Sequence, residues 1–190
     1  HLPFASLDSL VGNPSPTFQR WLQHQSLDAY WDSMQPSPED YRRLALPIFT
    51  RTGMYDGDQL GAMTFYRDHM QYGSPEARAK HHLMIGPWDH AGTRIPQKEF
   101  GGLAFGDASL VDIKALEASW YDWTLKGGAP PPLFRKRVAY YLTGADEWKY
   151  ADSLEEIGQN PTRYYLPSPG GGAGDVFSSG ILAPAPPGPP

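Results

Sequence analysis

The stretch LPIFTRTGMYDGDQLGAMTFY, residues 46–66, together with HLMIG, residues 82–86, sets the expected fold of this chain. Residues 46–53 are mostly apolar or β-branched and are bounded by proline and glycine, which is typical of a strand. Apolar residues then recur at helical spacing, and Gly73 is expected to end that helix. Because residues 82–86 indicate a second strand, the order strand, helix, strand predicts two parallel strands of an α/β fold with a right-handed crossover.

The residues before the first predicted strand show helical spacing of apolar side chains and include many aromatic residues. Apolar side chains recur at helical spacing in residues 16–22 and again in residues 27–34. Proline interrupts helices, so Pro36 and Pro38 are expected to stop the second of these helices. We therefore expect two short helices ahead of the first strand.

The strongest helical pattern follows the second strand, in residues 107–126. Asp107 is the expected N-cap of this helix and Gly127 its expected end. Three consecutive prolines at residues 130–132 then mark a boundary, and the pattern changes to short β-type runs. A new domain is therefore expected to start near Arg135.

The sequence pattern after this boundary indicates β-strands and no helix. Residues 138–142 and 163–166 are short strand candidates, and residues 167–190 are rich in proline and glycine. The predicted organisation comprises an N-terminal helical segment, an α/β segment and the incomplete start of a β-sandwich, at residues 1–40, 41–134 and 135–190.

Composition and charge exclude several classes of protein. The chain has 190 residues, 16 Lys and Arg against 21 Asp and Glu, and a formal net charge of −5. An acidic chain without a basic stripe cannot neutralise phosphates, so we expect no nucleic-acid partner. Zero cysteines exclude a disulfide framework, a thiolate metal site and a cysteine nucleophile. No apolar run approaches the roughly 18 residues of a membrane span, so we expect a soluble protein that does not bind membranes, in an unknown compartment.

Two chemically active side chains each follow a predicted strand. Asp56 comes after residues 46–53, and His90 comes after residues 82–86. Functional groups gather at the carboxyl ends of parallel strands, so these side chains are expected to meet as a carboxylate–histidine pair. The order acid then histidine fits an α/β-hydrolase triad. The alternative is that Asp56 only forms a turn or caps a helix and His90 is simply solvated.

Neighbouring residues also have two interpretations. Tyr55 and Trp88 are expected mainly to pack, with substrate contact as the alternative. Asp58 is expected to cap the following helix, with substrate binding as the alternative. The residues around His90 contain no known metal-binding motif, so we expect no metal site.

The two segments resemble the acid and histidine segments of the CocE/NonD hydrolases, the group of cocaine esterases, α-amino acid ester hydrolases and X-Pro dipeptidyl-peptidases. The most specific likeness is Gly-Pro-Trp-x-His, followed by Gly-x-Tyr-Asp-Gly. Residues 18–34 resemble the end of the family's helical cap, and residues 137–158 resemble the start of its jelly-roll domain. The resemblance implies the C-terminal part of an α/β-hydrolase fold, with Asp56 as triad acid and His90 as triad base. It implies no cofactor, and a small ester, amide or short peptide as substrate.

The family's nucleophile is a serine in a Gly-x-Ser-x-Gly elbow. No serine of this chain has glycine two positions earlier. The resemblance therefore implies that the nucleophile lies upstream of His1 and that the chain alone is inactive. In the ester hydrolases, acids just after the triad acid help to bind a substrate ammonium group. Asp58 matches one of these positions, whereas Gln59 stands where that branch carries a second acid. The alternative is a non-catalytic remnant, an interaction module that exposes apolar surface and can form a homo-oligomer.

Overall fold

The computed structural model describes residues 3–166 and 181–186. Its contacts divide the chain into two compact units, His1–Tyr150 and Ala151–Pro190. The candidate site lies entirely in the first unit. Among the described residues, no helix is both long and apolar enough to cross a membrane.

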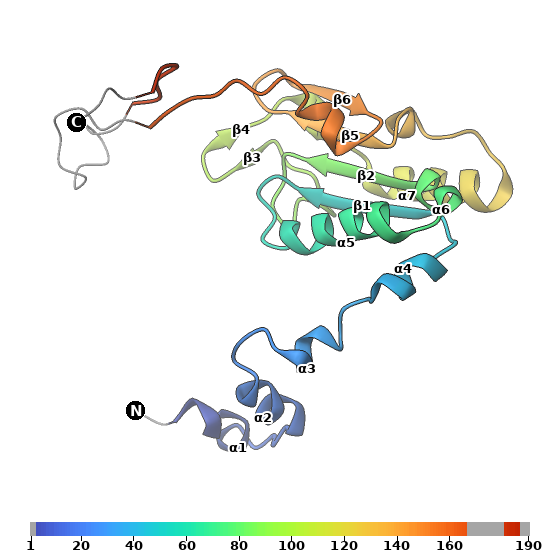
Figure 1. Ribbon diagram of the computed structural model, residues 1–190. Coiled ribbons are helices and arrows are strands. Elements are labelled where there is room, and N and C mark those ends of the chain that lie inside the picture. Colours follow the sequence, from blue (N-terminus) through green and yellow to red (C-terminus); the bar gives the residue numbers. More distant parts are fainter. Residues whose placement is uncertain (1–2, 167–180, 187–190) are drawn as a thin grey trace. The chain divides into compact units, whose positions relative to one another are not determined.

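A four-stranded sheet forms the centre of the first unit (Figure 1). Strand β1 (Ile48–Gly53) pairs in parallel with β2 (His81–Gly86), which pairs in parallel with β5 (Val138–Leu142). Strand β6 (Glu147–Ala151) follows β5, so the strand order is β1-β2-β5-β6 and β1 is an edge strand. The parallel pair predicted from the strand, helix, strand order is confirmed.

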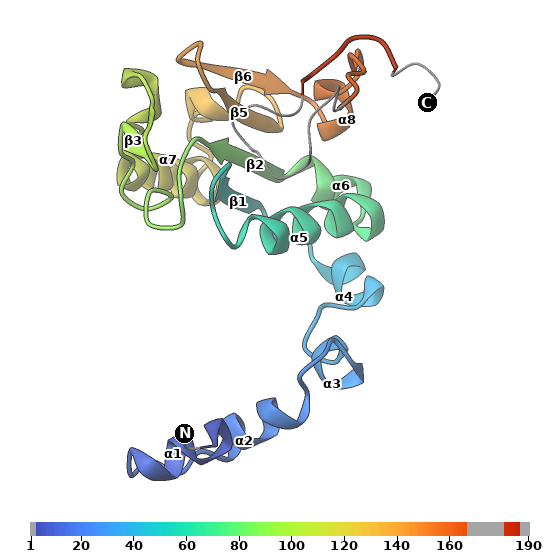
Figure 2. The ribbon, with the colours of Figure 1, turned by 90° about the vertical axis from the view of Figure 1, so that its left-hand side faces the viewer.

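Two 14-residue helices cover opposite faces of β1, namely α5 (Gln59–Tyr72) and α7 (Ile113–Lys126). The Phe49 ring packs against Trp120 of α7 at a centroid distance of 5.7 Å. Its neighbour Thr50 instead bonds to His81, whose ring packs against Tyr66 of α5. Successive side chains of a strand point to opposite faces, so the two helices lie on different sides of the sheet (Figure 2).

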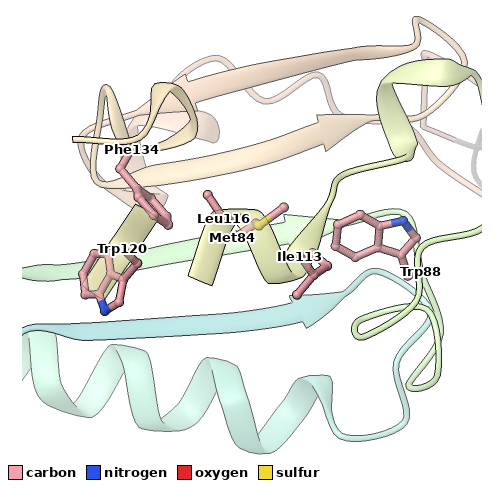
Figure 3. Close-up of a cluster of buried hydrophobic side chains, with 6 residues drawn as sticks. All are labelled: Met84, Trp88, Ile113, Leu116, Trp120 and Phe134. Carbon is pink, nitrogen blue, oxygen red and sulfur yellow. The ribbon is translucent and has the colours of Figure 1, made fainter. Parts of the chain in front are cut away.

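The buried core lies between the sheet and α7 (Figure 3). Met84 of β2 is fully buried there, and the Trp88 indole is 1% exposed. Met84 lies in β2 and Trp88 in the loop that follows it, so the same packing that stabilises the sheet also supports this loop. The cluster consists of Met84, Trp88, Ile113, Leu116, Trp120 and Phe134.

Helix α7 starts later than the sequence pattern predicts. Asp107 begins a short 3-10 turn, η2 (Asp107–Ser109), and the helix itself starts at Ile113. Asp112 is its N-cap, because the Asp112 side chain accepts a hydrogen bond from Ala115 N at 3.0 Å. The predicted end is confirmed, since Gly127 has a φ of +72° in the left-handed region that favours glycine.

The N-terminal region contains more helices than expected. The two predicted helices are present as α2 (Pro16–Gln23) and α3 (Ala29–Asp32). The second predicted helix ends before Pro36, as expected, but the sequence analysis missed a further helix, because Pro38 begins α4 (Pro38–Arg43). Proline is tolerated in the first turn of a helix, where its missing N–H has no intrahelical partner. The short elements η1 (Phe4–Ser6), α1 (Leu7–Leu10) and α6 (Pro75–Ala79) complete the helices up to β2.

Strand β5, which the sequence pattern placed in a following β domain, lies next to β2 in the central sheet. Val138 and Ala139 are 0% and 1% exposed and pair with Leu83 and Met84 of β2. Of the expected strand at residues 163–166, only an isolated bridge between Tyr165 and Ala183 forms. Most of residues 167–190 lie outside the described residues. The remaining elements are β3 (Glu99–Phe100), β4 (Leu103–Ala104), η3 (Pro132–Phe134) and α8 (Leu154–Ile157).

Candidate active site

The site lies where β1 and β2 end side by side. Gly53 and Gly86 are paired in register as the last residues of the two strands. The loops stay together beyond this point, because Met54 N donates to Gly86 O at 2.8 Å and Tyr55 N donates to Trp88 O at 3.0 Å. The two loops are thus held against each other before either candidate catalytic side chain is reached.

The position of Trp88 explains why both strands end in glycine. A Cβ atom on Gly53 would lie 1.9 Å from Trp88 O, and a Cβ atom on Gly86 would lie 2.2 Å from the Trp88 ring. The indole Nε1 of Trp88 donates to Ser109 O at 3.0 Å. Trp88 therefore acts as an internal support for the histidine loop, which agrees with the packing interpretation.

Asp56 and His90 meet as the sequence predicts. His90 Nδ1 lies 3.1 Å from Asp56 Oδ1, and the Asp56 side chain is only 6% exposed. Asp58 N donates to Asp56 Oδ1 at 2.9 Å, and Thr52 Oγ1 donates to Asp56 Oδ2 at 3.3 Å. Burial by itself raises the pKa of Asp56, but the hydrogen bonds from Asp58, His90 and Thr52 outweigh burial and lower this pKa. Asp56 is therefore a carboxylate at neutral pH.

The other nitrogen of the His90 ring identifies the tautomer. His90 Nε2 lies 3.1 Å from Arg94 Nη2. A guanidinium only donates hydrogen bonds, so Nε2 accepts and the ring proton is on Nδ1, facing Asp56. This is the tautomer that a histidine base needs, with its free lone pair on Nε2. The His90 side chain is 51% exposed, so the ring can reach an incoming group.

Arg94 is the site residue that the sequence analysis missed. The available signal was its spacing, four residues after His90 and within the same loop. The segment after His90 turns back on itself, because Thr93 N donates to Asp89 O and Arg94 N donates to Ala91 O. This turn returns the arginine side chain to the imidazole.

Asp58 approaches the same histidine nitrogen as Asp56. Its Oδ2 lies 3.2 Å from His90 Nδ1, and its side chain is 79% exposed. Asp58 occupies the N-cap position of α5, as predicted, but its side chain makes no capping hydrogen bond. Asp56, Asp58 and His90 could each offer one ligand atom to a cation. In the observed arrangement Nδ1 donates its hydrogen bond to Asp56, so this nitrogen is not free as a ligand.

Tyr55 lies beside the site but packs away from it. Its ring stacks near Phe105 at 6.1 Å and contacts Phe100 at 5.8 Å. The structure thus places Tyr55 and Trp88 in supporting positions, whereas Asp58 and His90 are exposed at the surface of the site.

A cleft of about 640 Å³ opens at the site and extends along the free edge of β1. Arg51 of β1 pairs with Glu117 of α7 at 2.7 Å within its lining. Among the described residues, no serine hydroxyl makes a hydrogen bond to the His90 ring. The lining includes the site residues Asp56, Asp58, His90 and Arg94, the β1 residues Ile48, Phe49 and Arg51, and the helix residues Phe65, Glu117 and Trp120.

The comparisons with known proteins agree with this geometry. Residues 4–92 match the family described as X-Pro dipeptidyl-peptidase (S15 family). This segment contains β1, α5, β2 and both Asp56 and His90. The chain has no significant match among curated proteins.

Two solved structures share the fold. An aminopeptidase from the marine sediment archaeon Thaumarchaeota archaeon superposes with a TM-score of 0.61 and 23% identity, over 86% of this chain and 26% of that protein. An α-amino acid ester hydrolase, solved with a selenomethionine label, gives a TM-score of 0.60 and 22% identity, over 80% of this chain and 24% of that protein. The chain thus spans about a quarter of each of these proteins.

Proposed function

Because the family match confirms the resemblance to CocE/NonD-type hydrolases, we propose that this chain is the acid–base part of a serine-type acyl hydrolase. The observation that supports this proposal most strongly is the 3.1 Å contact between Asp56 and His90. The two residues come from adjacent parallel strands, and the buried acid is ionised. If His90 were only solvated and Asp56 only formed a turn, the two side chains would not need to contact each other.

The chemistry assigned to these residues is a proton relay. His90 Nε2 takes the proton of an attacking serine hydroxyl while the serine oxygen forms a bond to the acyl carbon. His90 then gives this proton to the leaving alcohol or amine as the bond to the acyl carbon breaks. Asp56 keeps the Nδ1–H tautomer in place and stabilises the imidazolium that forms between the two steps. Water repeats the sequence to release the acid.

We place the nucleophile in a part of the sheet that would lie beyond the free edge of β1. Ile48 N and Met54 N donate to residues next to or within β2, at Lys80 O and Gly86 O. In a parallel pair every second residue bonds to the same neighbour, so Phe49 and Arg51 direct their backbone groups outward. A parallel strand at this edge would end near His90, in the cleft that already contains Asp56 and His90.

The proposed substrate is an ester or amide whose acyl group carries an amino group. The names of the similar proteins, an X-Pro dipeptidyl-peptidase family, an aminopeptidase and an α-amino acid ester hydrolase, agree with this class. The exposed carboxylate of Asp58, which makes no capping bond, is the candidate contact for the ammonium group. The N-terminal helices are the candidate lining of the substrate pocket, and the chemistry requires no cofactor.

A serine-directed fluorophosphonate tests this proposal on two polypeptides. One is the 190-residue chain, and the other is a polypeptide extended upstream to include a Gly-x-Ser-x-Gly segment. We expect labelling and turnover of an activated amino acid ester only in the extended form. Specific labelling of the 190-residue chain would contradict the assignment of the nucleophile. An extended form without turnover would favour the alternative of an interaction module.

A further inference from the structure

Arg94 makes an unusual contact for a residue beside a histidine base. Its Nη2 donates to His90 Nε2 at 3.1 Å, and this is the nitrogen that must accept the nucleophile's proton. The loop holds Arg94 in this position, because Gly92 N donates to Asp89 Oδ1 at 2.7 Å and Ile95 N donates to Ala91 O at 3.1 Å. Arg94 therefore occupies the hydrogen-bonding position that the nucleophile has to take.

The charge of Arg94 has no acidic partner among the residues described. Arg51, the other arginine of the cleft, is neutralised by Glu117 at 2.7 Å. Within residues 3–166, the contact with His90 is the one side-chain hydrogen bond that the Arg94 guanidinium makes. The Arg94 side chain is exposed. A guanidinium has five N–H donors, so most of its donor capacity faces the cleft and the solvent.

A carboxylate is the group that best matches this free guanidinium. Two parallel N–H···O bonds between arginine and carboxylate are shorter and stronger than a single bond to a neutral nitrogen. A carboxylate-bearing ligand in the cleft would thus compete with His90 for Arg94. Once Arg94 has moved to the carboxylate, His90 Nε2 becomes free to accept a proton.

We propose that Arg94 is a specificity-determining residue that binds a carboxylate group of the substrate and, in doing so, releases His90 Nε2. The inference rests on the proposed function, since it gives Arg94 a role beside the assigned base. It narrows the substrate class to esters and amides that carry a free carboxylate. Asp58 on the Nδ1 side of His90 and Arg94 on the Nε2 side then present opposite charges to the two ends of a short peptide-like molecule.

The test measures binding and does not depend on turnover. The 190-residue chain is labelled with ¹⁵N at histidine and arginine, and the His90 Nε2 and Arg94 side-chain signals are followed by NMR. The probes are N-acetyl-L-alanine and its uncharged amide, at equal pH and ionic strength. We expect the carboxylate to shift the Arg94 signal and to move the Nε2 signal of His90 in the direction of a lost hydrogen bond. We expect the amide to leave both signals in place.

Three variants separate the proposed role from a general effect of charge. In Arg94→Gln the response of Nε2 to the carboxylate should be lost, and in Arg94→Lys it should be weakened because the planar fork is absent. Arg67→Gln removes an exposed arginine of α5 and should respond like the unchanged chain. Equal responses to the two probes, no response to either, or an undiminished response in Arg94→Gln would overturn the inference. The assignment of His90 and Asp56 would survive each of these results, because it depends on turnover in the extended form.

Discussion

The Nδ1 atoms of His69 and His81 lie 2.9 Å apart in the buried layer between α5 and β2. One ring must donate and the other must accept, so the contact exists only while at least one Nδ1 is unprotonated. His81 Nε2 also lies 2.8 Å from Thr50 Oγ1. The pair therefore joins a helix to two strands through rings that are 0% exposed.

This pair should make the protein sensitive to mild acid. Burial, followed by the nearby His69, lowers the pKa of His81 to about 3, and burial lowers the pKa of His69. Between pH 6.5 and about 3 the unfolded chain binds more protons than the folded one, so the free energy of unfolding should fall as the pH falls through this range. Arg78 and Arg137 lie near the pair and further oppose its protonation.

Urea unfolding at a series of pH values from 7.5 to 4.5 checks this expectation. Arg67→Gln is the control, since Arg67 is exposed on α5. This variant should keep the pH dependence of the unchanged chain. His69→Gln, by contrast, should weaken it, while the buried His82, whose pKa burial lowers to about 4, still contributes. A midpoint that stays constant from pH 7.5 to 4.5 would contradict the role given to the histidine pair.

Asp56→Asn should greatly reduce turnover in the extended form that contains the nucleophile. An asparagine cannot stabilise the imidazolium, and its amide can hold the wrong tautomer of His90, so a loss of about 10⁴ in kcat is expected. His90→Ala should cost at least as much. Asp122→Asn, at an exposed position of α7, is the control and should keep full activity. The measurement is the steady-state hydrolysis of an activated ester, with circular dichroism to verify the fold.

Gly53→Ala and Gly61→Ala should change stability in opposite directions. The new methyl group of Gly53→Ala would overlap Trp88 O, so the free energy of unfolding should fall by about 1–3 kcal/mol. Gly61 lies inside α5 with nothing within 4 Å of the new methyl group. Alanine is favoured over glycine inside a helix, so Gly61→Ala should stabilise by about 0.5–1 kcal/mol. Equal effects of the two substitutions in urea unfolding would show that Trp88 does not constrain the end of β1.

Trp120→Ala should strongly destabilise the core of the first unit. Trp120 is 6% exposed and its ring contacts Phe49, His82 and Phe134. Removing so large a buried side chain costs about 3–5 kcal/mol. Trp21→Ala, where the tryptophan is 51% exposed, is the matched control and should cost much less. Thermal unfolding followed by circular dichroism distinguishes the two variants.

Local patterns account for the parts of the fold that the sequence predicted correctly. The strands at β1 and β2 and the intervening α5 are each defined by their own residues, so their order and parallel pairing could be predicted. The meeting of Asp56 and His90 followed from this pairing. Gly127 likewise ends α7 through its own backbone conformation.

The features that were missed depend on contacts that no local sequence pattern specifies. Asp107 has the right chemistry for an N-cap, but its carboxylate pairs with Lys98, and the helix starts after Asp112. Strand β5 resembles any short β segment, and its place in the central sheet depends on pairing with β2. Arg94 carries no motif of its own, and its place beside the site is visible only from its contact with the His90 ring.

The free edge of β1 has a consequence for how activity would arise. Under the proposed function, strands added at this edge would extend the sheet and bring the nucleophile to His90. Hydrolysis would then report the joining of two polypeptides, as in a split-enzyme reporter whose signal appears only on reassembly. The 190-residue chain would be the inactive partner of such a pair, and it already holds the acid and the base.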